Sequence, residues 1–331
     1  MSHVQNLIVT DNEDGMRLDR WFKAHFPEIR FGQLQRMLRT GQIRIDSGRV
    51  QTNTRLETGQ SVRVPPLKPE EAKEKTHTGP TKLHPSDLDF IQSLVIFKDD
   101  DLLVLNKPTG LAVQGGSKTG RHIDGLLDGL QFDAPERPRL VHRLDKDTSG
   151  VLLLARTRLA ATALSQSFKS RSARKTYWAL VNGVPRYKAG EITLPLRKTG
   201  PHGQEKMRIA ERSDKQALPA NTHYEIIECA AQKFAWLAMS PVTGRTHQLR
   251  VHALGLGHSI VGDGKYGGSA AHPGGEIPKH LHLHSYSMEL PHPNKKGKSF
   301  KISAPLPEHM AKTWELLQFN LAPVMDKKSA F

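Results

Sequence analysis

Cysteine is almost absent from this chain of 331 residues, which contains Cys229 alone. A single thiol cannot close an internal disulfide or supply the thiolates of a cysteine-based zinc site. Long apolar runs are also missing, because no stretch approaches the roughly 20 apolar residues that a membrane helix needs. Residues 1–9 are polar, so no signal peptide is expected. These features favour a cytoplasmic protein without a membrane partner.

Acidic residues are scarce relative to basic ones. The chain has 48 Lys and Arg against 33 Asp and Glu, which gives a formal net charge of +15. A positive field of this size attracts polyanions and speeds their encounter with the protein. Nucleic acid is therefore favoured as the partner over two alternatives, mere solubility and attraction to an anionic membrane surface.

The first 64 residues are expected to form a small domain of their own. Apolar residues at helical spacing predict helices over 16–26 and 31–39. Apolar residues alternate with arginine at 43–45 and 62–64, as they do in half-buried strands. Several arginines are expected on the outer surface of this unit, among them Arg36, Arg39 and Arg44.

The order of these elements resembles the S4 RNA-binding domain. That family has a pair of helices, then a strand and turn, then a closing strand, and the matching stretches here are 41–47 and 57–62. The resemblance implies an RNA-binding module in which Arg36, Arg39 and Arg44 contact RNA. A solvated basic helix face is the alternative interpretation.

A change of composition separates this unit from a larger one. Residues 65–90 are rich in proline and polar residues with almost no apolar ones, so they are interpreted as a partly extended linker. Residues 91–331 form the second domain, in which strands and helices mix without regular βαβ alternation, so the fold class is α+β. Strands are expected at 94–97, 102–106, 140–143, 151–155, 177–182, 221–228, 234–240 and 280–289, and helices at 157–170, 246–254 and 307–319.

The densest polar sequence of the large domain covers residues 142–150, between two apolar strand candidates. Loops between buried strands are where a rigid scaffold presents reactive groups. Asp145 and Asp147 lie beside Arg143 and Lys146, and a nearby cation keeps a carboxylate ionised and nucleophilic. A charged, capped turn explains the same composition, and spacing does not choose between the two aspartates.

A second polar stretch covers residues 243–252 and is expected to enter a helix. His247 and Arg250 are about one helical turn apart, which places them on one face. A helix start beside Arg245 suits a phosphate group. Metal binding by His247 and His252 is disfavoured, because their spacing of five residues does not suit one helix face.

Two further patterns are weaker. From 156 to 175 there are six Lys and Arg and no acidic residue, and this run ends beside Tyr177. A basic strip with an aromatic side chain suits RNA with unpaired bases, although a solvated helix face is the common alternative. His280, His282 and His284 alternate along a predicted strand, where solvent-facing or hydrogen-bonded imidazoles are favoured over a metal site.

Taken together, these stretches resemble the RluA-type pseudouridine synthases, and the continuation at 114–116 is closest to the large-subunit ribosomal RNA synthases of the RluC kind. The similarity extends from about residue 94 to 305. It rests on four motifs in order, which occupy residues 106–113, 142–150, 174–181 and 243–252, the last followed by 261–263 and 266–267. The resemblance implies a mixed, mainly antiparallel sheet for the catalytic domain.

The resemblance also implies roles for individual residues. Asp145 would be the catalytic carboxylate, Asp147 a structural neighbour, and Arg250 the guanidinium that pairs with Asp145 and keeps it ionised. Arg143 would hold the displaced nucleotide or fill the place of the flipped uridine. Tyr177 would stack on the base and is the favoured group for assisting proton removal at C5. The remaining expected contacts are Leu249 with the base, and Lys107, Arg171, Arg174, Lys175 and Arg245 with RNA.

The implied reaction breaks the C1′–N1 bond of uridine, turns the base and joins C1′ to C5. It needs neither redox chemistry nor group transfer, so neither a cofactor nor a metal is expected. The implied partner is structured RNA, with large-subunit ribosomal RNA favoured over transfer RNA, and a monomer is expected. The alternatives are a catalytically silent RNA-binding or ribosome-assembly protein, and a nucleic-acid hydrolase such as an N-glycosidase.

Overall fold

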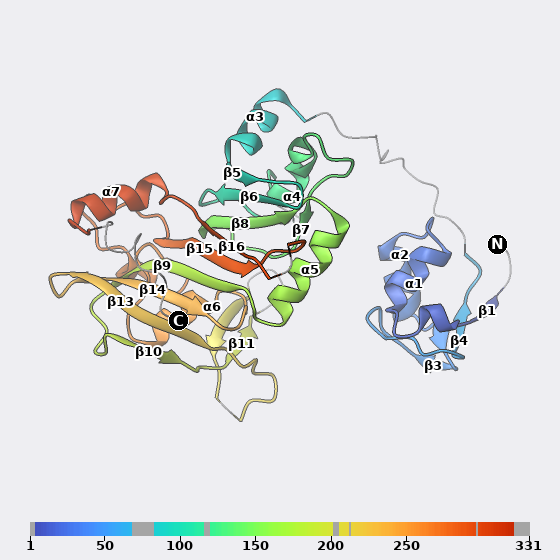
Figure 1. Ribbon diagram of the computed structural model, residues 1–331. Coiled ribbons are helices and arrows are strands. Elements are labelled where there is room, and N and C mark those ends of the chain that lie inside the picture. Colours follow the sequence, from blue (N-terminus) through green and yellow to red (C-terminus); the bar gives the residue numbers. More distant parts are fainter. Residues whose placement is uncertain are drawn as a thin grey trace. The chain divides into compact units, whose positions relative to one another are not determined.

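The computed structural model describes residues 4–67, 83–115, 120–200, 205–211, 213–295 and 297–320 (Figure 1). The chain divides into two compact units, Met1–Gly79 and Pro80–Phe331. The middle of the expected linker, residues 68–82, lies outside the described residues.

The amino-terminal unit combines two helices with a small antiparallel sheet. Its sheet has the strand order β1-β4-β2-β3. The helix expected at 31–39 has those bounds, and the helix expected at 16–26 is confirmed over a shorter range. The elements are β1 (Gln5–Ile8), η1 (Asp11–Glu13), α1 (Leu18–His25), α2 (Phe31–Arg39), β2 (Arg44–Ile45), β3 (Gly48–Arg49) and β4 (Ser61–Val64).

Both helices bury their apolar faces in one core with the sheet. Trp21 and Phe22 of α1, Leu34 of α2 and Val62 of β4 are all members of it. Leu67 is only 4 % exposed and belongs to the same core, so the unit extends beyond the expected boundary at residue 64.

A ten-stranded mixed sheet forms the centre of the large unit. Its main path is β10-β13-β14-β9-β15-β8-β6-β5, with β7 paired to β8 and β16 paired to β15. All pairings are antiparallel except that of β15 with β8, so the expected mainly antiparallel α+β fold is confirmed. The strands are β5 (Val95–Lys98), β6 (Leu102–Lys107), β7 (Arg139–Leu140), β8 (Ser149–Ala155), β9 (Arg174–Asn182), β10 (Ala189–Ile192), β13 (Thr222–Ala230), β14 (Phe234–Pro241), β15 (Leu283–Pro291) and β16 (Ser299–Ser303).

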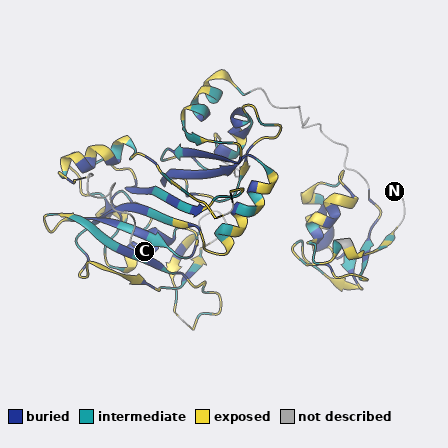
Figure 2. Cartoon of the chain, in the orientation of Figure 1, coloured by how far each residue is buried: buried dark blue, intermediate teal, exposed yellow. Residues whose placement is uncertain are grey.

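The middle strands are buried on both faces (Figure 2). Alternate side chains of a strand point to opposite faces. Leu103 and Leu105 of β6 accordingly join one hydrophobic cluster, whereas Leu102 and Val104 join another, with α5. Continuous apolar runs such as Val151–Ala155 follow from this two-sided burial.

Helices and a separate hairpin complete the large unit. The helices are α3 (Pro85–Ser93), α4 (Ile123–Leu126), η2 (Leu127–Leu130), α5 (Arg158–Lys169), α6 (Gln248–Gly255), η3 (Gly268–Ala271) and α7 (Glu308–Leu316), and the hairpin strands are β11 (Leu196–Thr199) and β12 (Lys206–Ile209). Within the described part of the chain, no helix has the length and apolar character needed to cross a bilayer.

Helix α3 corrects the expected linker, because residues 85–90 are helical rather than extended. Pro85 occupies the first turn, where its missing N–H costs nothing, and the His84 side chain accepts from the Ser86 N–H. The helix buries chiefly Ile91 in the large core, so its sequence contains few apolar residues. The strand expected at 140–143 is also shorter, since β7 ends at Leu140 and leaves residues 142–148 as a loop.

Candidate functional site

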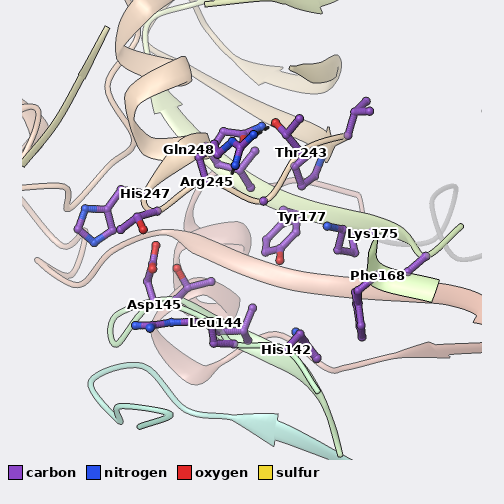
Figure 3. A pocket seen from close by; sticks show the side chains of 18 of the residues that line it. His142, Leu144, Asp145, Phe168, Lys175, Tyr177, Thr243, Arg245, His247 and Gln248 are labelled. Carbon is purple, nitrogen blue, oxygen red and sulfur yellow. Dashed lines mark hydrogen bonds between the residues drawn. The ribbon is translucent and has the colours of Figure 1, made fainter. Parts of the chain in front are cut away.

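A cavity of about 490 Å³ opens where the loop at 142–148, the end of α5, strand β9 and the start of α6 meet. Asp145 and His247 lie at one end of it and His142, Phe168 and Lys175 at the other, with Tyr177 between them (Figure 3). The structure thus brings together eight of the expected site residues: Arg143, Asp145, Arg171, Lys175, Tyr177, Arg245, Leu249 and Arg250.

The loop that carries Asp145 ends where β8 pairs in parallel with β15. Ser149 pairs with His284 and Gly150 with Ser285, and the Ser149 hydroxyl lies 2.9 Å from Nδ1 of His284. Gly150 has φ +106°, and a Cβ there would lie 2.2 Å from the Ser285 carbonyl oxygen. Only glycine therefore permits this close approach, which positions the end of the loop.

Lys107 is buried inside the fold rather than exposed on a surface that RNA could reach, which differs from the sequence-based expectation. Its side chain is 0 % exposed, and Nζ donates to the carbonyl oxygens of Pro108 (2.8 Å), Leu111 (2.8 Å) and Lys146 (2.9 Å). The ammonium group thus fastens the Asp145 loop to the end of β6 from inside the fold. Burial lowers the pKa of Lys107 to about 7, although the charges of Asp147 and Asp145 oppose this shift.

Arg250 also differs from its expected arrangement. Its guanidinium is 5 % exposed and donates from Nε to Oδ2 of Asp263 at 2.9 Å and from Nη2 to Oδ1 at 2.6 Å. In the described residues, its ion-pair partner is thus Asp263 and not Asp145. Asp145 acts on Arg250 at longer range, as one of the charges that raise the pKa of the guanidinium against the effect of its burial.

Tyr177 extends from β9 into the cavity, and its side chain is 9 % exposed. Burial raises the pKa of its phenol to about 12, and the negative charge of Asp145 contributes to the increase. The phenol is consequently protonated near neutral pH. This state suits stacking on a base, but it disfavours the phenolate that would remove a proton from C5.

The stretch at 243–252 enters its helix later than expected. His247 has φ +52°, in the left-handed region, so α6 begins at Gln248 rather than at 246. The Gln248 side chain fixes the segment that leads into α6, since its Oε1 accepts hydrogen bonds from the Thr243 hydroxyl (2.7 Å) and from the Arg245 N–H (3.0 Å). This arrangement directs both Arg245 and His247 to the cavity.

Three histidines that the sequence offers as possible metal ligands form hydrogen bonds within the fold instead. His252 is within hydrogen-bonding distance of Thr222 and the Leu194 carbonyl. His282 contacts the His280 carbonyl and Thr313, and His284 contacts Ser149 and the Ala304 carbonyl. Within the described ranges, no group of three or more metal-ligating side chains gathers.

The other expected RNA contacts lie outside the cavity lining. Arg174 is exposed on β9. In the amino-terminal unit Arg36 and Arg39 are exposed on α2, whereas Arg44 donates to the Gly41 and Ser47 carbonyls and so supports its own turn. Lys175, by contrast, lines the cavity, and burial there lowers the pKa of its ammonium group.

Three residues of the site were given no role from sequence. Asp263 holds Arg250, the Tyr266 hydroxyl lies 2.6 Å from Nδ1 of His247, and Lys265 adds a positive charge near His247. Asp263 and Tyr266 follow the 243–252 motif at short distance in the sequence, but spacing does not reveal which side chains they contact.

Comparison with known proteins gives a consistent result. Residues 101–254 match a family model described as RNA pseudouridylate synthase. Ribosomal large subunit pseudouridine synthase C of Pasteurella multocida is 36% identical over 315 residues, covering 93% of this chain and 92% of that protein. The protein of the same name from Yersinia pestis is 36% identical over 317 residues, covering 92% of each chain.

A solved structure agrees with these relatives. Human RNA pseudouridylate synthase domain containing 4 superposes with a TM-score of 0.58 at 27% identity, covering 71% of this chain and 98% of that one. The matched family model includes the Asp145 loop, Tyr177 and the entry to α6. On the identity and coverage of its relatives, the chain belongs to the RNA pseudouridine synthases, the isomerases that convert uridine to pseudouridine.

Proposed function

We propose that this protein isomerises uridines of large-subunit ribosomal RNA and that Asp145 is the reacting carboxylate. The substrate proposal is supported by relatives that are named for the large ribosomal subunit. The catalytic proposal is supported by one observation above all: the half-buried Asp145 lines the cavity with Tyr177 and His247 while the neighbouring guanidinium of Arg250 is held by Asp263.

The carboxylate has two chemical routes. It attacks C1′ of the sugar, or it stabilises the positive sugar as the base departs, and both routes require the ionised form. Asp263 accepts the hydrogen bonds of the Arg250 guanidinium, so this cation does not occupy the oxygens of Asp145. No step transfers electrons to an external acceptor, so we propose that the reaction proceeds without a cofactor or metal.

The base must leave its stack before Asp145 can reach C1′. Unstacking costs a few kcal/mol, which contacts with an aromatic ring and with phosphates offset. Tyr177 is the ring we assign to the base and Leu249 its apolar neighbour. Arg143, Arg171, Lys175 and Arg245 line the same cavity and are assigned to the RNA backbone and to the displaced nucleotide.

We assign RNA binding to the amino-terminal unit, which would thereby set the affinity for RNA and the choice of uridine. Its support is the S4-like order of elements and the exposed Arg36 and Arg39. The protein is proposed to act in the cytoplasm as a monomer.

The test is incubation with large-subunit ribosomal RNA that carries tritium at C5 of its uridines. Isomerisation releases tritium to water while the base stays attached to the chain. Transfer RNA labelled in the same way is the comparison substrate. Release from ribosomal RNA supports the proposal, release from transfer RNA alone contradicts the substrate, and free uracil would identify an N-glycosidase instead.

A further inference from the structure

His247 and Tyr266 form a pair at the end of the cavity that contains Asp145. The Tyr266 hydroxyl lies 2.6 Å from Nδ1 of His247, and their rings meet edge to face at 5.5 Å. The same hydroxyl accepts the backbone N–H of Met207 at 3.2 Å. Tyr266 therefore joins strand β12 to a side chain of the site.

The hydrogen bonds of the Tyr266 hydroxyl are consistent with a His247 proton on Nε2. A tyrosine hydroxyl carries a single proton, and its oxygen already accepts from Met207. Donation of that proton to Nδ1 of His247 satisfies all three groups and leaves the ring proton on Nε2. The histidine proton is therefore assigned to Nε2.

Burial favours the neutral form of the His247 ring. Burial lowers the pKa of His247, the positive charges of Arg250 and Lys265 lower it further, and Asp145 and Asp263 oppose them. A neutral imidazole leaves the Asp145 carboxylate unmasked, whereas an imidazolium would compete for it as a counter-ion. Its Nε2–H is still a hydrogen-bond donor.

The position of this donor is maintained at a conformational cost. His247 has φ +52°, a left-handed conformation that a residue with a side chain rarely adopts. Tyr266 also places its ring 5.2 Å from the guanidinium carbon of Arg250, and its backbone N–H donates to Asp263 at 3.2 Å. One tyrosine thus links the ion pair, the imidazole and β12.

We propose that His247 is a catalytic residue whose Nε2–H donates a hydrogen bond to O2 of the uracil as the C1′–N1 bond breaks, with Tyr266 as its positioning residue. This proposal rests on the isomerase activity and on Asp145 acting at C1′. O2 is the carbonyl oxygen nearest to that bond, and Asp145 and His247 share one end of the cavity (Figure 3).

The step balances without proton transfer from the histidine. The electron pair of the C1′–N1 bond passes to the uracil, where N1 and O2 share the negative charge. The hydrogen bond to O2 strengthens as this charge develops. An interaction that is stronger in the transition state than in the bound substrate accelerates the reaction. The base then turns and C5 bonds to C1′. In a later step C5 loses its proton to solvent and N1 takes up a proton from solvent.

The test compares His247→Ala, His247→Gln, Tyr266→Phe and the control Tyr224→Phe in single-turnover reactions on ribosomal RNA. The Tyr224 hydroxyl donates to the Tyr187 carbonyl at 3.4 Å and does not line the cavity, so its removal is a matched hydroxyl deletion. We expect His247→Ala to lower the rate constant about 100-fold with RNA affinity nearly unchanged. Tyr266→Phe should lower it about tenfold, the equivalent of one hydrogen bond of roughly 1.4 kcal/mol.

A change of leaving group separates this role from a structural one. Fluorine at C5 makes uracil a weaker base and therefore a better leaving group, which needs less help from a hydrogen bond to O2. On RNA that contains 5-fluorouridine, with substrate consumption as the readout, the ratio of wild-type to His247→Ala rate constants should be at least about fivefold smaller than on uridine. His247→Gln, whose amide N–H replaces the donor, should recover part of the rate.

The outcomes distinguish this proposal from the proposed function. A rate constant for His247→Ala within about twofold of the wild-type value would overturn the role of His247. It would leave the proposed function unaffected. Equal deficits on uridine and 5-fluorouridine would also overturn it, because a misfolded site impairs both. An inactive wild-type protein would instead contradict the proposed function itself.

Discussion

Arg250 and Asp263 form a buried bidentate ion pair, with the guanidinium 5 % and the carboxylate 1 % exposed. The guanidinium of Arg250 is therefore paired with a residue that takes no part in the proposed reaction. Asp145 experiences the positive field of Arg250 while its own oxygens stay available to the cavity. The ion pair thus separates the source of the field from the group that reacts.

Breaking this pair should destabilise the large unit. Asp263→Asn leaves the Arg250 guanidinium buried without a counter-charge, which costs about 3–5 kcal/mol. Urea unfolding monitored by tryptophan fluorescence measures this loss of unfolding free energy, since three of the four tryptophans lie in this unit. Lys312→Ala, which removes an exposed ion pair with Glu308, is the control and should not change the unfolding free energy measurably.

Lys107 should make stability depend on pH. Its folded pKa of about 7 lies below the ordinary value of 10.5, so the unfolded chain binds more protons between these values and stability rises with pH. Relative to Lys107→Met, the wild type should gain roughly 2 kcal/mol from about pH 6.5 to about pH 8.5. A difference between the two proteins that stays constant over this range would contradict the buried ammonium.

Tyr177 should act through its ring rather than as a phenolate. Because burial raises its pKa to about 12, the ratio of wild-type to Tyr177→Phe activity should not change between about pH 7 and about pH 9. Measuring kcat/KM for both proteins over this range checks it. A ratio that increases about tenfold with each pH unit would identify the phenolate as the base that removes the C5 proton.

Much of the fold could be predicted from periodicity. Helix α2 and the buried strands β6, β8 and β14 follow directly from apolar spacing. Helix α3 is not predictable in this way, because it buries chiefly one side chain and its composition is that of a linker. The short hairpin β11–β12 is basic and exposed at many positions, and this composition does not distinguish strands from loops.

Part of the site could likewise be predicted from the sequence, and part of it could not. The motifs identified Asp145, Tyr177 and Arg250 as neighbours, and the cavity contains all three. The burial of Lys107 is not predictable, because sequence spacing does not distinguish a surface lysine from one that donates to three carbonyls inside the fold. The Asp263 and Tyr266 contacts depend on how the segment after α6 returns to it, which is a tertiary relationship that local patterns do not contain.

Asp145→Asn is the most direct test of the whole account, because the amide keeps the shape of the carboxylate and removes its charge. We predict that tritium release from C5-labelled ribosomal RNA falls at least about 10³-fold, while RNA affinity stays within about threefold of the wild type. Release at the wild-type rate by Asp145→Asn would contradict the assignment of Asp145 as the reacting carboxylate.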